Sequence, residues 1–283
     1  MKKMSVNPNG KKIGLALGGG AFRGAAHIGV LQVLEEKGIK PSHISGTSIG
    51  AFIGVLYAFG IPVQKMLEIA RGITWMSISH FTLSKMGLLT NDEIGDIIID
   101  LLGKERLIEE APIPLSIIAT DIEKGSKVVF EKGSVIDAVL ASTCIPGIFI
   151  PIEINKRMLV DGFLVENVPI TPLQNKELDM IIAVNLNARR SYNPPDDIID
   201  IIVSALDIAI EVHSHSIIRN ADVIIEPDVG SYSRFDSKKV DKFYEQGYRA
   251  AKKAMPNIRK FLKRKKPGGT SRFFQNIKNF LNR

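Results

Sequence analysis

The chain has 283 residues, a hydrophobic content of 45% and a formal net charge of +7. This length suits one large α/β domain or two small ones, with enough apolar residues for a sizeable core. A single cysteine, Cys144, excludes an internal disulfide framework. The longest uncharged apolar run, residues 49–63, is shorter than the ~20 residues that cross a bilayer. No secretory-signal pattern follows the basic start, so we expect a cytoplasmic protein.

Hydrophobic periodicity predicts alternating strands and helices. Short buried strands at 12–17 and 44–47 are each followed by a helical pattern, at 23–37 and 49–59. Such alternation implies right-handed βαβ units and a parallel sheet. Further helices are expected at 62–71, from a capping box at 90–93 through 102, and at 134–141, 196–220 and 237–254; strands are expected at 179–186 and 223–225, and hairpins at 115–131 and 152–160.

The expected fold is a three-layer α/β/α arrangement with a mostly parallel central sheet. Residues 75–89 show no clear period, and we interpret them as a lid or cap. No linker composition interrupts residues 10–255, which favours one catalytic domain there and a separate tail at 256–283.

Two motifs follow the first two predicted strands. Gly18-Gly19-Gly20-Ala21-Phe22-Arg23-Gly24 comes after the first, and Gly46-Thr47-Ser48-Ile49-Gly50 after the second. A G-x-S-x-G between a strand and a helix forces a sharp turn that exposes the serine oxygen. A glycine-rich loop at a helix start presents backbone N–H groups to an oxyanion. Together the two motifs predict acyl transfer.

Each motif has a simpler alternative when it stands alone. The glycine-rich loop could be a dinucleotide-binding fingerprint, but residues 40–47 lack the acidic residue which that site needs after its second strand. A G-x-S-x-G can be an ordinary tight turn, and so can the pair Asp161-Gly162. Their occurrence in one order is what favours a catalytic interpretation.

The two motifs, together with Asp161-Gly162 after the segment NKRMLV, resemble the patatin-like phospholipase family, over roughly residues 12–225. The resemblance implies a catalytic dyad of Ser48 as nucleophile and Asp161 as general base. It also implies an oxyanion hole built from Gly19, Gly20 and Ala21, in which Gly19 and Gly20 match the family's glycines, with Gly18 next to them. Ala21 stands where some members have glycine, and Arg23 is expected to brace the loop or approach a lipid phosphate. The supporting motif positions are Gly18, Arg23, Gly24, Gly46, Gly50 and Gly162.

Histidines offer a different base. A Ser–Asp–His order would admit His213 or His215, although both lie deep in a predicted helix, whereas the histidines of such triads usually sit on loops. His27 lies one helical turn after Arg23 and is expected to pack or to form a hydrogen bond. No H-E-x-x-H motif or cysteine cluster indicates a metal, so no metal and no cofactor are expected.

The charge is concentrated at the C-terminal end. Residues 252–283 contain 11 basic and no acidic residues, whereas the rest of the chain has 26 basic and 30 acidic residues. Apolar residues recur at helical spacing at 258–262 and again at 273–281. A basic amphipathic segment of this kind is typical of a membrane interface, here an anionic one. Nucleic acid is the rival partner, but no base-reading motif is present and none is expected.

The sequence therefore predicts a serine acyl hydrolase that cleaves fatty-acyl esters of phospholipids or lysophospholipids through an acyl-enzyme. We expect it in the cytoplasm, with a peripheral position on the inner face of the membrane. One alternative is an acyltransferase or thioesterase with a histidine base on the same scaffold. The other is a non-catalytic membrane adaptor.

Overall fold

The computed structural model describes residues 7, 10–82, 84–188 and 198–263. Its main sheet has the order β10-β9-β1-β2-β5-β8-β7, with β6 paired to β5. The first five strands of that order run parallel, and β6, β7 and β8 pair antiparallel. The bounds are β1 Ile13–Leu17, β2 His43–Thr47, β5 Leu115–Asp121, β6 Ser126–Phe130, β7 Ile152–Ile154, β8 Arg157–Asp161, β9 Met180–Val184 and β10 Val223–Ile225. The mostly parallel sheet and both hairpins are confirmed.

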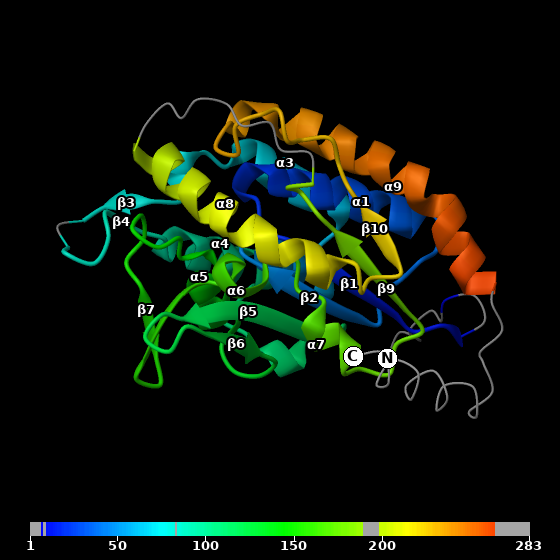
Figure 1. Cartoon of the computed structure of the whole chain (residues 1–283), viewed down its shortest axis with the longest axis horizontal. Coiled ribbons are helices and arrows are strands. Elements are labelled where there is room, and N and C mark those ends of the chain that lie inside the picture. The colour runs from blue at the N-terminus through cyan, green and yellow to red at the C-terminus, as the bar shows by residue number, and fades with distance from the viewer. Residues whose placement is uncertain (1–6, 8–9, 83, 189–197, 264–283) are drawn as a thin grey trace.

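Helices cover both faces of this sheet (Figure 1). One face packs against α1 (Ala25–Glu36), α2 (Ile49–Ala58), α3 (Val63–Gly72) and α9 (Val240–Lys263) in the largest hydrophobic cluster. The other face packs against α7 (Thr171–Gln174) and the end of α8 (Ile198–Ile218). The remaining helices are α4 (Asp92–Leu102), α5 (Val135–Thr143) and α6 (Phe163–Glu166). The three-layer α/β/α prediction is therefore confirmed.

Strand β5 carries two chain segments side by side on one edge. Thr47, the last residue of β2, pairs with Ile118, and Asp161, the last residue of β8, pairs with Ala119. The opposite edge of β5 is occupied over the same stretch by β6. The residue before Ser48 and the acid Asp161 are thus held by consecutive residues of one strand.

Helix α9 lies along α1, and the two backbones approach closely (Figure 1). A Cβ on Gly29 would lie 2.1 Å from the Tyr244 carbonyl oxygen, and one on Gly247 would lie 1.9 Å from that of Ala26. The expected end of this helix at residue 254 is wrong, because α9 continues through Pro256 to Lys263. Ile258 and Leu262 are buried in the main core, so the helix crosses the expected boundary between catalytic domain and tail.

The segment 75–89 folds into a small flap. Its strands β3 (His80–Phe81) and β4 (Leu89–Thr90) form a two-stranded antiparallel sheet. Leu89 bridges to Phe149, and the two backbones exchange hydrogen bonds at Ile148 and Ile150. The predicted capping box at the start of α4 is wrong, because the helix has Asn91 as its N-cap and no side chain caps it. The side-chain amide of Asn91 instead donates to the Leu140 carbonyl and the Thr143 hydroxyl.

None of the helices in the described ranges is both long and apolar enough to cross a membrane. The predicted amphipathic segment at 273–281 lies outside the described residues.

Candidate active site

Ser48 occupies a strained turn between β2 and α2. Its backbone has φ 55° and ψ −127°, a conformation that residues other than glycine rarely adopt. The neighbouring glycines make this turn possible: a Cβ on Gly50 would lie 2.1 Å from the Leu17 carbonyl oxygen, and one on Gly46 would lie 2.5 Å from the Ala51 Cα. The Ser48 amide donates to the Ser142 hydroxyl at 2.8 Å. Ser48 thus has the local geometry of a nucleophile elbow.

The glycine-rich loop lies directly beside this turn. The amide of Gly19 donates to both the backbone and the side-chain oxygen of Asn167, each at 3.2 Å. Among the described residues, no acceptor contacts the amides of Gly20 and Ala21, and Ala21 has φ 49°. These two unengaged amides are therefore the ones in the loop that can bind an oxyanion. Gly18 donates to the Val184 carbonyl and is already engaged in the sheet.

Asp161 is buried at the end of β8. Its Oδ1 accepts a hydrogen bond of 2.9 Å from the Phe163 amide. Burial raises the pKa of Asp161 to about 7, while the hydrogen bonds from the Ser48 hydroxyl and the Phe163 amide oppose that rise. Gly162 keeps the chain tight here, since a Cβ on it would lie 2.3 Å from the Ile118 carbonyl oxygen. A carboxyl group with this pKa can exchange a proton near neutral pH.

A small polar recess of about 340 Å³ joins these groups. It is lined by the loop residues 19–21, Ser48 and Asp161, and also by two charged residues that the sequence analysis did not identify, Asp207 of α8 and Arg234. Asn167 and Asn187 complete its polar lining. Asp207 and Arg234 form an ion pair with each other, and both are largely buried. The structure therefore brings the predicted serine, acid and glycine loop together around one recess.

Arg23 ties the glycine-rich loop to the loop before α9. Its guanidinium is buried and donates to the carbonyls of Gly230 and Tyr232 and, at 3.4 Å, to the Asn187 side chain. Of its two expected roles, the structural one fits this geometry. Glycine is needed at position 24 for close packing, because a Cβ there would lie 2.2 Å from the Ile49 side chain.

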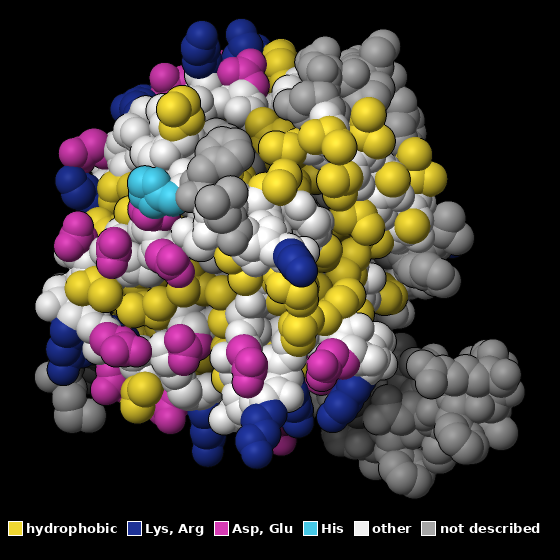
Figure 2. All heavy atoms as spheres, turned by 90° about the vertical axis from the view of Figure 1, so that its left-hand side faces the viewer, with side chains coloured by type: hydrophobic (Ala, Val, Ile, Leu, Met, Phe, Trp, Pro, Cys, Tyr) yellow, Lys and Arg dark blue, Asp and Glu magenta, His cyan; other side chains and the backbone are white. Residues whose placement is uncertain are grey.

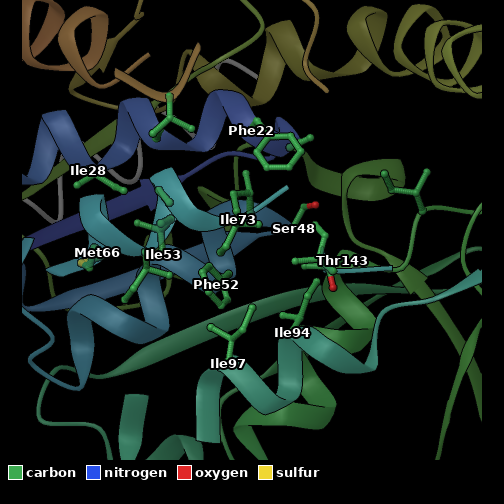
Figure 3. Close-up of a pocket in the computed structure, with 18 of the residues that line it drawn as sticks. Phe22, Ile28, Ser48, Phe52, Ile53, Met66, Ile73, Ile94, Ile97 and Thr143 are labelled. Carbon is green, nitrogen blue, oxygen red and sulfur yellow. The ribbon is translucent and has the colours of Figure 1, made fainter. Parts of the chain in front are cut away.

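An apolar cavity opens on the other side of Ser48 (Figure 3). It holds about 900 Å³ of space, including its open mouth. In Figure 3, Ile28 and Met66 lie on the side of the cavity away from Ser48, beyond Phe52. Ser48 and Thr143 are its hydroxyl-bearing residues; the apolar lining is Ala21, Phe22, Ala25, Ile28, Ile49, Phe52, Ile53, Met66, Ile69, Ala70, Ile73, Ile78, Ile94, Ile97, Ile145, Phe149 and Val240.

Hydrophobic side chains are also exposed near the flap. The most exposed large ones in the described ranges include Met76 and Met86 of segment 75–89 and Ile198, Ile201 and Ile208 of α8. Figure 2 views the end of the molecule that bears the flap, where a band of hydrophobic side chains crosses the face and charged ones gather along its left and lower margins. Contiguous exposed apolar surface is a common feature of interaction sites.

Among the described side chains, no histidine is bonded to Asp161. His27 is fully buried, its Nε2 bonds the Gly18 carbonyl at 2.7 Å, and burial lowers its pKa to about 4. It therefore supports the glycine loop as a hydrogen-bonding residue. His213 and His215 lie in α8, but their side chains are outside the described part of the structure. Within the described residues, no group of three or more His, Cys, Asp or Glu side chains could hold a metal ion.

The model of the patatin-like phospholipase family matches residues 15–173 of this chain. The chain belongs to this family. The match contains the glycine-rich loop, the Ser48 turn and Asp161, and it ends before Asp207 and Arg234.

Several known proteins resemble the chain over different lengths. An uncharacterized NTE family protein of Mycobacterium bovis is 37% identical over 179 residues, which are 62% of this chain and 49% of that protein. Lysophospholipase NTE1 of Candida glabrata is 35% identical over 192 residues, 66% of this chain and 11% of that protein. The structure of VipD from Legionella pneumophila aligns at 14% identity with a TM-score of 0.45, covering 88% of this chain and 70% of the other. The chain thus spans about half the length or less of these curated relatives.

Proposed function

We propose that this chain is a serine acyl hydrolase that cleaves fatty-acyl esters of phospholipids or lysophospholipids. The observation that carries the proposal is the position of Ser48, which lines both the apolar cavity and the polar recess. A fatty-acyl chain fits the apolar side, and the ester carbonyl then lies beside the loop amides and Asp161. An apolar cavity that reaches an activated hydroxyl suits a substrate with a long acyl chain and an ester carbonyl.

The residues support a two-step mechanism. Asp161 accepts the Ser48 proton as the serine oxygen attacks the acyl carbonyl, and the amides of Gly20 and Ala21 bind the developing oxyanion. The proton passes from Asp161 to the leaving alcohol, which departs and leaves an acyl-serine ester. Water then attacks that ester, Asp161 again accepts the proton, and the fatty acid is released while Ser48 regains its hydrogen. The positive end of α2, which begins at Ile49, adds a favourable field at Ser48.

The relatives support a lipid substrate. NTE1 of Candida glabrata is named a lysophospholipase, and the match to it includes 66% of this chain. The exposed hydrophobic side chains around the flap suit a protein that meets lipid aggregates. We extend the proposal to a cytoplasmic location with peripheral attachment at an anionic membrane surface through the basic residues beyond Lys263.

A lipid panel tests the proposal. Purified wild type, Ser48→Ala and Asp161→Asn are compared on phospholipids and lysophospholipids by fatty-acid release. Ser126→Ala and Asp137→Asn, both exposed, are matched controls. We expect both site variants to lose at least about a thousandfold in kcat and both controls to keep wild-type turnover. If turnover survives in Asp161→Asn and collapses when His213 and His215 are replaced, the general base is a histidine and not Asp161. Turnover that survives in Ser48→Ala would refute the proposal.

A further inference from the structure

Two buried charges line the catalytic recess without belonging to the dyad. Asp207, on the inner face of α8, and Arg234, in the loop before α9, are about one-tenth exposed. Arg234 approaches the Asp207 carboxylate with both terminal nitrogens. Replacing a buried ion pair by apolar residues of similar volume is often neutral or stabilising. Stability therefore gives no reason to place this pair beside a buried acid.

The loop that carries Arg234 is tied to the glycine-rich loop. The Phe22 amide donates to the Arg234 carbonyl at 2.9 Å. Arg23 holds the carbonyls of Gly230 and Tyr232 a few residues earlier. Because these backbone contacts fix the loop, the Arg234 side chain has a defined place in the recess.

Among the described residues, few other groups contact Asp161. From β5, the Thr120 hydroxyl donates to the backbone carbonyl of Asp161, and from α6 the Phe163 amide donates to the Asp161 Oδ1. From the end of α5, Cys144 lies nearby, but burial raises the pKa of its thiol to about 12 and keeps it neutral. In the described part of the chain, the charged side chains that act on Asp161 are Arg234, which favours its ionised form, and Asp207, which disfavours it.

We propose that Asp207 and Arg234 are a positioning pair that sets the pH range in which Asp161 can act as a base. This rests on the proposed function. Arg234 stabilises the Asp161 carboxylate, and Asp207 offsets that effect so that the acid still accepts a proton near neutral pH. The two members of one ion pair thus act on the dyad with opposite signs.

The opposite signs give the test. The pH dependence of kcat/KM is measured with p-nitrophenyl butanoate, a soluble ester without a phosphate. Asp207→Asn removes the negative charge that disfavours the Asp161 carboxylate, so the acid limb should move to lower pH by about one unit. Arg234→Gln removes the positive charge that favours it, so that limb should move to higher pH by a similar amount. The double variant should return close to the wild-type midpoint.

Two further measurements separate this role from a structural one. Arg234→Lys keeps the charge and should keep the wild-type midpoint, even if turnover falls. The rate of Ser48 labelling by a fluorophosphonate, followed against pH, should shift as kcat/KM does and reports on folded molecules alone. The double variant and Arg234→Lys keep the test valid if a single neutral variant does not fold.

Three outcomes would overturn the inference. In the first, the acid-limb midpoints of the folded variants stay at the wild-type value. In the second, the midpoints of Asp207→Asn and Arg234→Gln move in the same direction. Alternatively, Arg234 variants raise KM for a lysophospholipid while leaving the profile with the butanoate ester unchanged, in which case Arg234 binds the head group. None of these requires the Ser48→Ala result to change, so the pair can fail while the proposed hydrolase stands.

Discussion

Gly19 and Asn167 are joined through a single amide, which donates to both the backbone oxygen and the side-chain oxygen of Asn167. The contact links the loop after β1 to the segment that follows α6. It also engages the first of the loop amides that the family resemblance assigned to the oxyanion hole. The amides of Gly20 and Ala21 have no such acceptor among the described residues, so in the proposed oxyanion hole Gly19 would fix the loop and the other two amides would bind the charge.

The Gly19–Asn167 contact predicts a specific coupling between two substitutions. A Cβ on Gly19 would lie 2.8 Å from the Asn167 Oδ1, so Gly19→Ala should lower kcat/KM by at least about tenfold. Asn167→Ala removes that oxygen and should cost about 1 kcal/mol of stability. In the double variant the methyl group introduced at position 19 has more room, so Gly19→Ala should lower kcat/KM less in the Asn167→Ala background than in wild type. A double-mutant cycle measures the coupling, and strict additivity would contradict it.

The buried Asp161 makes stability depend on pH. Its folded-state pKa of about 7 is above its ordinary value of 3.8, so the folded state holds a proton that the unfolded state releases. Its contribution to stability is fully present below about pH 4 and is lost as the pH rises towards 7. Asp161→Asn should therefore stabilise the protein at pH 8 by roughly 4 kcal/mol more than at pH 4. Urea unfolding at both values checks this, with Asp137→Asn as the control that shows no such difference.

The strained backbone of Ser48 predicts a difference between two inactive variants. Alanine keeps the side-chain penalty of the positive φ, whereas glycine relieves it. We expect Ser48→Gly to be more stable than Ser48→Ala by about 1 kcal/mol, which raises the Tm by about 2–4 °C for a domain of this size. Scanning calorimetry of the two variants measures this difference in Tm. Equal Tm values would show that the turn carries no such strain.

The cavity predicts acyl-chain selectivity. Ile53 is buried and lines the part of the cavity away from Ser48 (Figure 3). A larger side chain there shortens the space, so Ile53→Phe should lower kcat/KM for a p-nitrophenyl dodecanoate by about tenfold or more and leave the butanoate ester nearly unchanged. Ile99→Phe, at an exposed position of α4, is the matched control. Equal losses on both esters would place the acyl chain elsewhere.

The length of α9 sets where the basic tail can be removed. Ending the chain after Lys263 removes six basic residues and leaves the helix whole. This truncation should weaken sedimentation with phosphatidylglycerol vesicles, because each basic residue near an anionic surface contributes about 1 kcal/mol. Hydrolysis of soluble esters should be unaffected. Vesicles of phosphatidylcholine alone are the control, and unchanged binding to the anionic vesicles would remove the membrane role from the tail.

Ending the chain after Met255 is a different experiment. It also removes Ile258 and Leu262, which are buried, and should cost several kcal/mol of stability. A thermal melt separates this structural loss from a loss of membrane binding.

The parts of the site that were predictable are those with a local signal. Ser48 and the glycine-rich loop lie in short motifs between apolar runs, so periodicity and glycine placement locate them. Asp161 required the family resemblance, because an Asp-Gly pair by itself is commonly a turn. Asp207 and Arg234 have no local signal: one is a lone acid in an apolar helix and the other a lone base in a loop. Their pairing exists only once α8 and the loop before α9 have packed around the recess.

The end of α9 was missed for a related reason. Proline disfavours a helix interior, so Pro256 favours a boundary, yet α9 continues through it. Packing of Ile258 and Leu262 in the main core outweighs that local cost. The tertiary contacts that decide such a case cannot be read from the residues near the proline.

The pairing of Thr47 with Ile118 and of Asp161 with Ala119 makes reactivity a measure of assembly. Ser48 and Asp161 meet only when β2 and β8 have both docked on β5 in register, and a slip of one residue turns each side chain to the opposite face of the sheet. Partly folded or misaligned chains would therefore be unreactive at Ser48.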